Sequence, residues 1–91
     1  MRTPPQVEGV CAVGSLQLHV RFRNGDERIY NCRPLLARSA FRPLSDPAFF
    51  RAVHVDPGGY GISWDDEIDL SEYELWTNGG DVDGAKEAEA P

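Results

Sequence analysis

The sequence predicts a single small α+β domain of antiparallel β-hairpins, with about five strands and one or two short helices. Three observations predict this class. The chain has 91 residues, a length typical of one domain. Residues 16–23 alternate apolar and polar side chains, the pattern of a strand with one buried face and one face in water. Asn24-Gly25 follows directly, and this dipeptide is the strongest short signal for a hairpin turn.

The first half of the chain is predicted to be mostly β-strand. Residues 1–6 are polar and rich in proline, which predicts a frayed N-terminus. The domain itself is expected over residues 7–76. Its first strand is predicted over residues 7–13, and Gly14-Ser15 marks the turn into the alternating strand.

Two registers of the Asn-Gly hairpin are open. A two-residue turn would bury Ile29, whereas a three-residue loop with a glycine bulge would bury Tyr30 and Cys32 instead. Because a slip of one residue exchanges the two faces of a strand, only one of these sets is buried. We favour the bulged form, since Tyr30 and Cys32 bury more apolar surface than Ile29 and Asn31.

The second half is predicted to hold a short helix and a second hairpin. Pro34 ends the returning strand because proline has no N–H to donate. Residues 35–44 form a partly apolar connection that can hold one helical turn. Asp46 as N-cap and Pro47 at the first helical position predict a short helix. A hairpin over residues 52–64 is expected to follow.

The stretch "ISWDDEIDLSEYELW" places six carboxylates between two tryptophans. Asp65 and Asp66 follow a strand and are predicted to lie in a turn, where such side chains accept bonds from backbone amides. Either Asp69 or Ser71 is expected to cap a short helix, since each has a glutamate three residues later, as in a capping box. We therefore interpret these acids as caps and solvated charge, not as catalytic groups or metal ligands.

The charge is unevenly distributed. Residues 1–64 hold eight arginines and five acids, a formal charge of +3, and residues 65–91 hold one lysine and ten acids, a charge of −9; together they give the net charge of −6. Residues 77–91 are dominated by glycine, alanine and acids, which predicts a disordered acidic tail.

Arg21 and Arg23 are predicted to line the wet side of the first hairpin, where Arg28 is a further candidate, and Arg33 is nearby in sequence. Together they form the candidate interaction surface. Arginine makes planar, two-pronged contacts with carboxylate and phosphate groups. An acidic protein partner suits such a surface, whereas the net charge of −6 opposes long-range attraction to nucleic acid. The candidate residues are Arg21, Arg23, Arg28 and Arg33.

The sequence predicts no catalytic site, metal site, cofactor or small-molecule ligand. Its histidines, His19 and His54, match no zinc spacing, and no serine lies in a nucleophile motif. Cys11 and Cys32 are expected to be reduced. The chain shows no signal-peptide core and no apolar run of membrane-spanning length, so a cytoplasmic location is expected.

Four segments together resemble a known family: "LHVRFRNGDERIYN", "PLL", "FRPLSDPAFFRAVHVD" and "ISWDDEIDLSEYELW". Their order and spacing resemble the family catalogued as domain of unknown function 2442, over residues 7–76. The positions that carry the pattern are Asn24, Gly25, Pro34, Leu35, Leu36, Trp64, Asp69 and Leu70.

The resemblance implies a small bacterial α+β domain with no established activity. Some relatives lie beside another small domain in an arrangement that resembles toxin–antitoxin pairs, and others carry a helix-turn-helix segment that these 91 residues do not show. The leading hypothesis is a non-enzymatic protein-interaction module, which binds a partner protein or another copy of itself. The alternative is a regulatory nucleic-acid-binding protein that uses an arginine-rich sheet face. Neither the partner nor the oligomeric state follows from the sequence.

Overall fold

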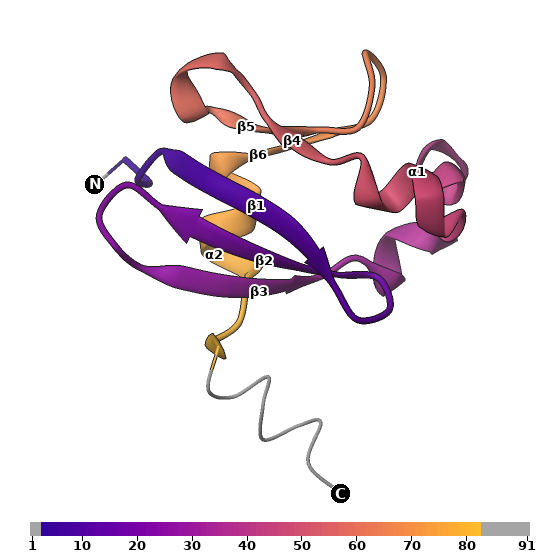
Figure 1. Ribbon diagram of the computed structural model, residues 1–91, viewed down its shortest axis with the longest axis horizontal. Coiled ribbons are helices and arrows are strands. Elements are labelled where there is room, and N and C mark those ends of the chain that lie inside the picture. The colour runs from indigo at the N-terminus through magenta and orange to yellow at the C-terminus, as the bar shows by residue number, and fades with distance from the viewer. Residues whose placement is uncertain (1–2, 83–91) are drawn as a thin grey trace, which may run out of the picture.

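The computed structural model describes residues 3–82 and shows two antiparallel sheets (Figure 1). The first sheet has the order β1 (Val7–Val13), β2 (Gln17–Phe22) and β3 (Glu27–Asn31). The second has the order β4 (His54–Val55), β5 (Gly61–Ser63) and β6 (Asp69–Ser71). The predicted α+β class is confirmed, with β6 as a strand that the sequence analysis did not predict.

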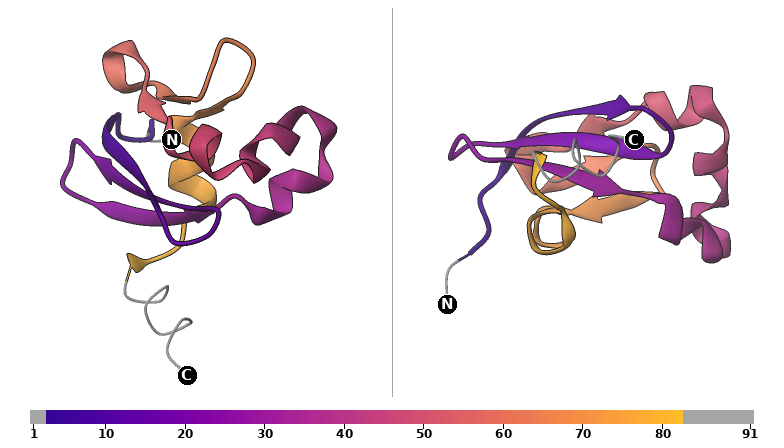
Figure 2. Two further views of the ribbon diagram at one scale, coloured as in Figure 1. Left: turned by 45° about the vertical axis from the view of Figure 1, so that its right-hand side comes forward. Right: turned by 90° about the horizontal axis from the view of Figure 1, so that it is seen from below.

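Short helices connect and flank the two sheets. Two 3₁₀ helices and one α-helix lead from the first sheet to the second: η1 (Arg33–Ala37), η2 (Ser39–Ser45) and α1 (Pro47–Arg51). A further 3₁₀ helix, η3 (Pro57–Gly59), joins β4 to β5, and α2 (Glu72–Asn78) follows β6. The connecting helices gather at one end of the molecule, while α2 runs behind the first sheet (Figures 1 and 2).

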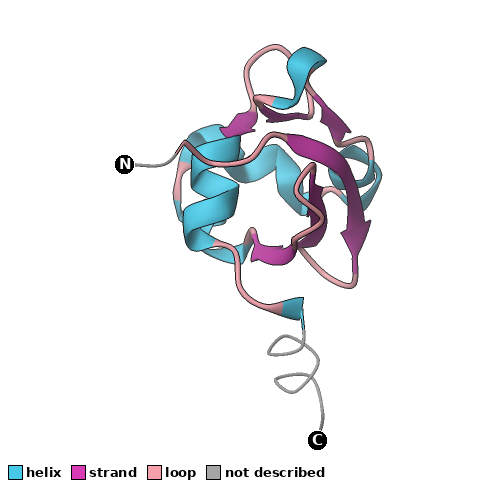
Figure 3. Ribbon diagram, turned by 90° about the vertical axis from the view of Figure 1, so that its left-hand side faces the viewer, coloured by secondary structure: helices cyan, strands magenta, loops and turns pink. Residues whose placement is uncertain are grey.

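The core lies between the two sheets and α2, which together surround it (Figure 3). β1 lies beside β4, and α2 contacts strands of both sheets. Trp76 of α2 meets the Phe22 ring edge-on, with 5.1 Å between ring centroids. The buried core residues are Val7, Leu18, Val20, Phe22, Tyr30, Cys32, Leu44, Phe50, Ile62, Trp64, Ile68, Leu70 and Leu75.

The first hairpin adopts the bulged register. The Phe22 N–H donates to the Asp26 carbonyl at 2.8 Å, which closes a three-residue loop, and Gly25 has the positive φ of 92° that this loop needs. Leu18 therefore lies opposite Tyr30. Tyr30 and Cys32 are both buried, as the bulged register predicts.

The predicted start of α1 is also confirmed. Pro47 is the first helical residue, and the Asp46 carboxylate accepts a hydrogen bond from the Ala48 N–H at 3.0 Å. Leu44 and Phe50 are buried on either side of this cap. Residues 35–44 do hold helical turns, but of the tighter 3₁₀ type.

The acidic stretch folds as a hairpin followed by a helix. Asp65 accepts hydrogen bonds from the N–H groups of Glu67 and Ile68, which forms the predicted turn. The Ser71 hydroxyl accepts from the Glu74 N–H at 3.1 Å and caps α2. Asp69 as cap is therefore wrong: it is an exposed β6 residue.

The folded domain extends beyond both predicted ends. The helix α2 continues to Asn78, and Gly80 and Ile29 exchange two backbone hydrogen bonds of 2.8 and 2.9 Å, so placing the end of the domain at Trp76 is wrong. At the other end, the Gln6 carbonyl accepts from the Arg23 N–H at 2.8 Å, so Gln6 is not frayed. The predicted tail from residue 83 onward, and residues 1–2, lie outside the described residues.

Replacing Ser71 with alanine is expected to lower the free energy of unfolding by about 1 kcal/mol, because the Glu74 N–H loses its acceptor. Asp69→Ala should change it by less than about 0.5 kcal/mol, since Asp69 is exposed and caps nothing. Urea unfolding of both variants measures the difference. A larger loss for Asp69→Ala than for Ser71→Ala would contradict this assignment of the cap.

Candidate functional site

Two of the four candidate arginines lie at the end of the first sheet that carries the Asn-Gly loop. Arg21 projects from the outer face of β2, and its guanidinium lies 3.9 Å from the Glu8 carboxylate. Arg23 follows β2, and its guanidinium donates to the Gln6 side-chain oxygen at 2.6 Å. Both side chains therefore already contact other residues of the chain.

The other two arginines lie elsewhere. Arg28 is paired with Val20 across the sheet, so it starts on the inner face and not on the wet face with Arg21. Its guanidinium carbon lies 4.1 Å from the centroid of the Trp76 ring, a cation–π contact. Arg33 begins η1 beyond the opposite end of β3 and donates to the Ser15 hydroxyl at 3.4 Å. The prediction that these arginines line one wet face is wrong for Arg28.

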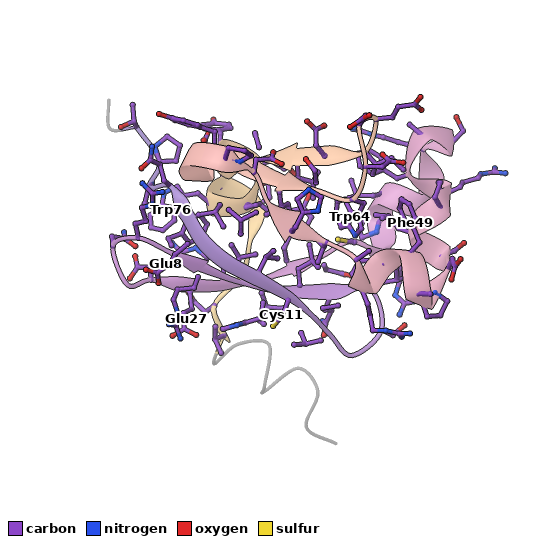
Figure 4. All side chains as sticks on the ribbon, turned by 45° about the horizontal axis from the view of Figure 1, so that its top comes forward. Glu8, Cys11, Glu27, Phe49, Trp64 and Trp76 are labelled. Carbon is purple, nitrogen blue, oxygen red and sulfur yellow. The ribbon has the colours of Figure 1, made fainter. Side chains whose placement is uncertain are left out.

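The outer face of the first sheet carries Glu8 and Glu27, which are labelled in Figure 4, and their basic partners Arg21 and His19. Cys11, His19 and Ile29 lie side by side across its three strands. The His19 ring nitrogen Nε2 lies 2.5 Å from a carboxylate oxygen of Glu27, in the same way that Arg21 faces an acid. This face is a set of local acid–base contacts, and residues 3–82 form no continuous track of positive charge on it.

The titratable groups with shifted pKa values are parts of the core. Burial raises the pKa of the Cys32 thiol to about 12. Burial raises the pKa of Tyr30 as well, and so does the hydrogen bond of 2.7 Å that its hydroxyl donates to the Glu74 carboxylate. Within residues 3–82, no three His, Cys, Asp or Glu side chains are grouped as metal ligands. Cys32 and Tyr30 therefore belong to the packing of the domain.

The pKa of Cys32 predicts that stability falls in alkaline solution. An unfolded chain releases this proton near the ordinary pKa of 9.0, whereas the folded chain holds it until about pH 12. Between these values the unfolded state binds fewer protons, so the free energy of unfolding falls as the pH rises, by up to about 1.4 kcal/mol per pH unit. Urea unfolding at several alkaline pH values measures the slope. Cys32→Ala should reduce it, and an equal slope in both proteins would contradict the assignment.

A groove lies at the end of the molecule where the helices gather. It separates the turn between β1 and β2 from η2 and α1, and it has a volume of about 490 Å³. Leu16 and Pro47 expose apolar surface in it, and the buried side chains of Leu44 and Phe50 form its floor. The full lining consists of Ala12, Gly14, Ser15, Leu16, Leu44, Ser45, Pro47, Phe50 and Arg51.

The backbone on the strand side of the groove is strained. Leu16 has a φ of 59°, in the left-handed region that a bulky side chain rarely enters. Such a conformation costs about 1–2 kcal/mol. Strained residues of this kind concentrate at binding and catalytic sites, where the fold holds a side chain in a required place. Here the left-handed conformation completes the turn between β1 and β2, and the Cys32 N–H donates to the Leu16 carbonyl at 2.8 Å, which fixes the backbone of Leu16 at the groove.

The surroundings of the groove are basic. Arg51 lines it, and Arg33 is bonded to Ser15, which also lines it. Residues 33–51 carry four exposed arginines and a single acid, Asp46. The sequence analysis missed this site because its two sides come from distant segments that share no local pattern.

Comparison with models of protein families assigns the chain to a family. A family model described as "Protein of unknown function (DUF2442)" matches residues 8–80. The chain belongs to this family. No curated protein and no solved structure matches it. The DUF2442 match ends at Gly80, the residue that pairs with Ile29, so the family pattern covers both sheets and α2.

The pattern positions of this DUF2442 domain lie in its turns and its core. Asn24 accepts a hydrogen bond from the Asp26 N–H at 2.9 Å and shapes the hairpin loop that Gly25 completes. Trp64 and Leu70 are buried, whereas Asp69 is exposed. The remaining pattern positions, Pro34, Leu35 and Leu36, form most of η1.

Among the described helices of the DUF2442 domain, none has the length and apolar character that crossing a membrane requires.

Proposed function

We propose that this DUF2442 domain is a small non-enzymatic protein-interaction module. Its groove would bind a short partner segment that carries a large apolar side chain beside carboxylates. The observation that carries the proposal is the combination in one groove of apolar side chains, a strained leucine and a basic rim.

The apolar part of the groove supplies the attraction. Leu44 and Phe50 are almost fully buried and form a rigid floor. Ala12, Leu16 and Pro47 expose apolar surface above it, so the groove needs little ordering on binding. Burial of one leucine-sized side chain contributes about 1.5–3 kcal/mol. One anchor of this kind supports a weak and reversible complex.

The arginines determine the specificity for the partner. Arg51 at the groove and Arg33 behind Ser15 suit carboxylates that flank the anchor. Charges at the rim of an interface affect specificity and the rate of association more than affinity. The proposed segment is therefore acidic, and binding should weaken as salt is added.

The cytoplasm is the proposed location of this interaction. Cys11 is an exposed free thiol and Cys32 a buried one, and free thiols persist in a reducing compartment. The pairing with a neighbouring toxin-like partner that the family resemblance implies stays a prediction. Nucleic-acid binding is less well supported, because Arg21 faces Glu8 and Arg28 covers Trp76.

The proposal is tested by measuring the affinity of the full chain for three matched peptides by fluorescence anisotropy. The first peptide is acidic with one central leucine, the second replaces that leucine with serine, and the third replaces its acids with lysines. We expect only the first to bind, with a dissociation constant on the order of 100 μM. Equal binding of the first and third peptides would contradict the charge argument.

Three variants locate the binding. Arg51→Gln should weaken the binding of the acidic peptide about two- to fivefold at low salt, as expected for an exposed ion pair. Ser45→Trp should abolish binding, because Ser45 lines the groove and is exposed, so a large side chain fits there without disturbing the core. Arg21→Gln removes the same charge from the outer sheet face and serves as the matched control, with no expected effect.

A further inference from the structure

A second pocket lies at the start of α2 and shares no lining residue with the groove. Its volume is about 510 Å³. The N-terminal segment 3–6 forms one side, and Tyr60 and Glu72 form the other. Pro4 and Pro5 in that segment have restricted backbones, so ordering this side costs little entropy.

Tyr60 is held in place although it is exposed. A Cβ atom built on Gly58 would lie 2.7 Å from the Tyr60 ring, so the ring packs directly against the Gly58 backbone. Gly58 has a φ of 82°, which suits glycine and permits this contact. The Tyr60 side chain nevertheless remains 64% exposed. An exposed aromatic ring with a fixed position is a binding surface for a cation or an apolar group.

Glu72 has an unsatisfied carboxylate oxygen. Its backbone N–H donates to the Tyr60 carbonyl at 3.0 Å, which fixes the two residues beside each other. Its Oε2 atom is buried, and no donor in the part of the chain that the structure describes reaches it. Burial of an acceptor without a partner is unfavourable, and more so for a charged group.

Glu72 is the charged residue among the described residues that line the pocket. The side-chain oxygen of Gln6, on the other side, already accepts a hydrogen bond from the Arg23 guanidinium at 2.6 Å, so Glu72 is the acceptor left for a positive group. Because its Oε2 atom is buried, the carboxylate must rotate to meet a positive group in the pocket.

We propose that this pocket binds the guanidinium or ammonium group of an arginine or lysine on a partner protein. The carboxylate of Glu72 pairs with the charge, and the Tyr60 ring lies against the cation. The inference is independent of the groove, because the two sites differ in lining residues and in the charge that they accept.

The test is a titration of the full chain with methylguanidinium and, separately, with ethylammonium. Binding is detected as changes in the chemical shifts of the backbone amides in NMR spectra. We expect saturable shifts near Gln6, Tyr60 and Glu72, with millimolar affinity. Glu72→Gln should weaken binding about tenfold without lowering the melting temperature, since the orphaned charge is removed. Tyr60→Leu should weaken it about two- to fivefold.

The matched control is Glu67→Gln, which removes the same charge from the exposed turn and should bind both cations as the unaltered chain does. Absence of saturable shifts, or equal binding by Glu72→Gln and the unaltered chain, would overturn the proposal.

Discussion

Replacing Trp64 with alanine is expected to lower the free energy of unfolding by about 3–5 kcal/mol. Trp64 is 5% exposed, and its ring stacks on Phe50 with 6.1 Å between centroids and 25° between the ring planes. Its indole N–H donates to the Phe50 carbonyl at 2.9 Å. The substitution therefore leaves a cavity and an unpaired buried carbonyl at the point where α1 meets the second sheet.

Thermal unfolding followed by circular dichroism measures this effect. For a domain of this length the loss corresponds to a fall in melting temperature of more than about 12 °C. Trp64→Phe keeps most of the volume and loses the hydrogen bond, so it should cost only about 1–2 kcal/mol. A loss below about 1 kcal/mol for Trp64→Ala would show that this contact does not hold α1 on the sheet.

Gly59→Ala is the second substitution with a large expected effect, a loss of about 2–5 kcal/mol in the free energy of unfolding. Gly59 has a φ of 78°, where alanine costs about 1–2 kcal/mol. Its added Cβ would also lie 2.6 Å from the Val7 carbonyl oxygen, so β1 and η3 must move apart. Overpacking of this kind costs about 1–3 kcal/mol.

Gly25→Ala separates the two causes of that loss. Gly25 has a φ of 92°, but an added Cβ there meets nothing within 4 Å. Urea unfolding should therefore show a loss of only about 1–2 kcal/mol for Gly25→Ala. Equal losses at the two glycines would mean that the contact between η3 and β1 contributes nothing.

The first hairpin and the cap of α1 could be predicted because their signals are local. Alternation along β2, the Asn-Gly dipeptide and the pair Asp46-Pro47 each determine the structure within a few residues. The register followed from comparing the apolar surface that Tyr30 and Cys32 bury. Such arguments need no knowledge of distant parts of the chain.

The strand β6 was missed because it has only three residues. Asp69 and Ser71 flank the buried Leu70, a pattern too short to distinguish a strand from the entry to a helix. The pairing with β5 decides between them, since Ile62 lies opposite Leu70. Once β6 exists, only Ser71 remains in position to cap α2.

The placement of Arg28 on the wet face was wrong for a different reason. The face that Arg28 takes depends on the hairpin register, and only the two-residue turn would place Arg28 on the wet face with Arg21. The same register that buries Tyr30 pairs Arg28 with Val20 and turns Arg28 towards Trp76. The groove in turn depends on long-range packing, because the β1–β2 turn and α1 are about 30 residues apart in sequence.

The central claim is that the groove beside Leu16 is the partner-binding site, and mapping the acidic peptide on the full chain by NMR tests it most directly. The account predicts that the largest shifts of backbone amides fall at Gly14–Leu16 and at Leu44–Arg51, and that Ser45→Trp removes them. Largest shifts on the outer sheet face, around Cys11, His19 and Arg21, would contradict it.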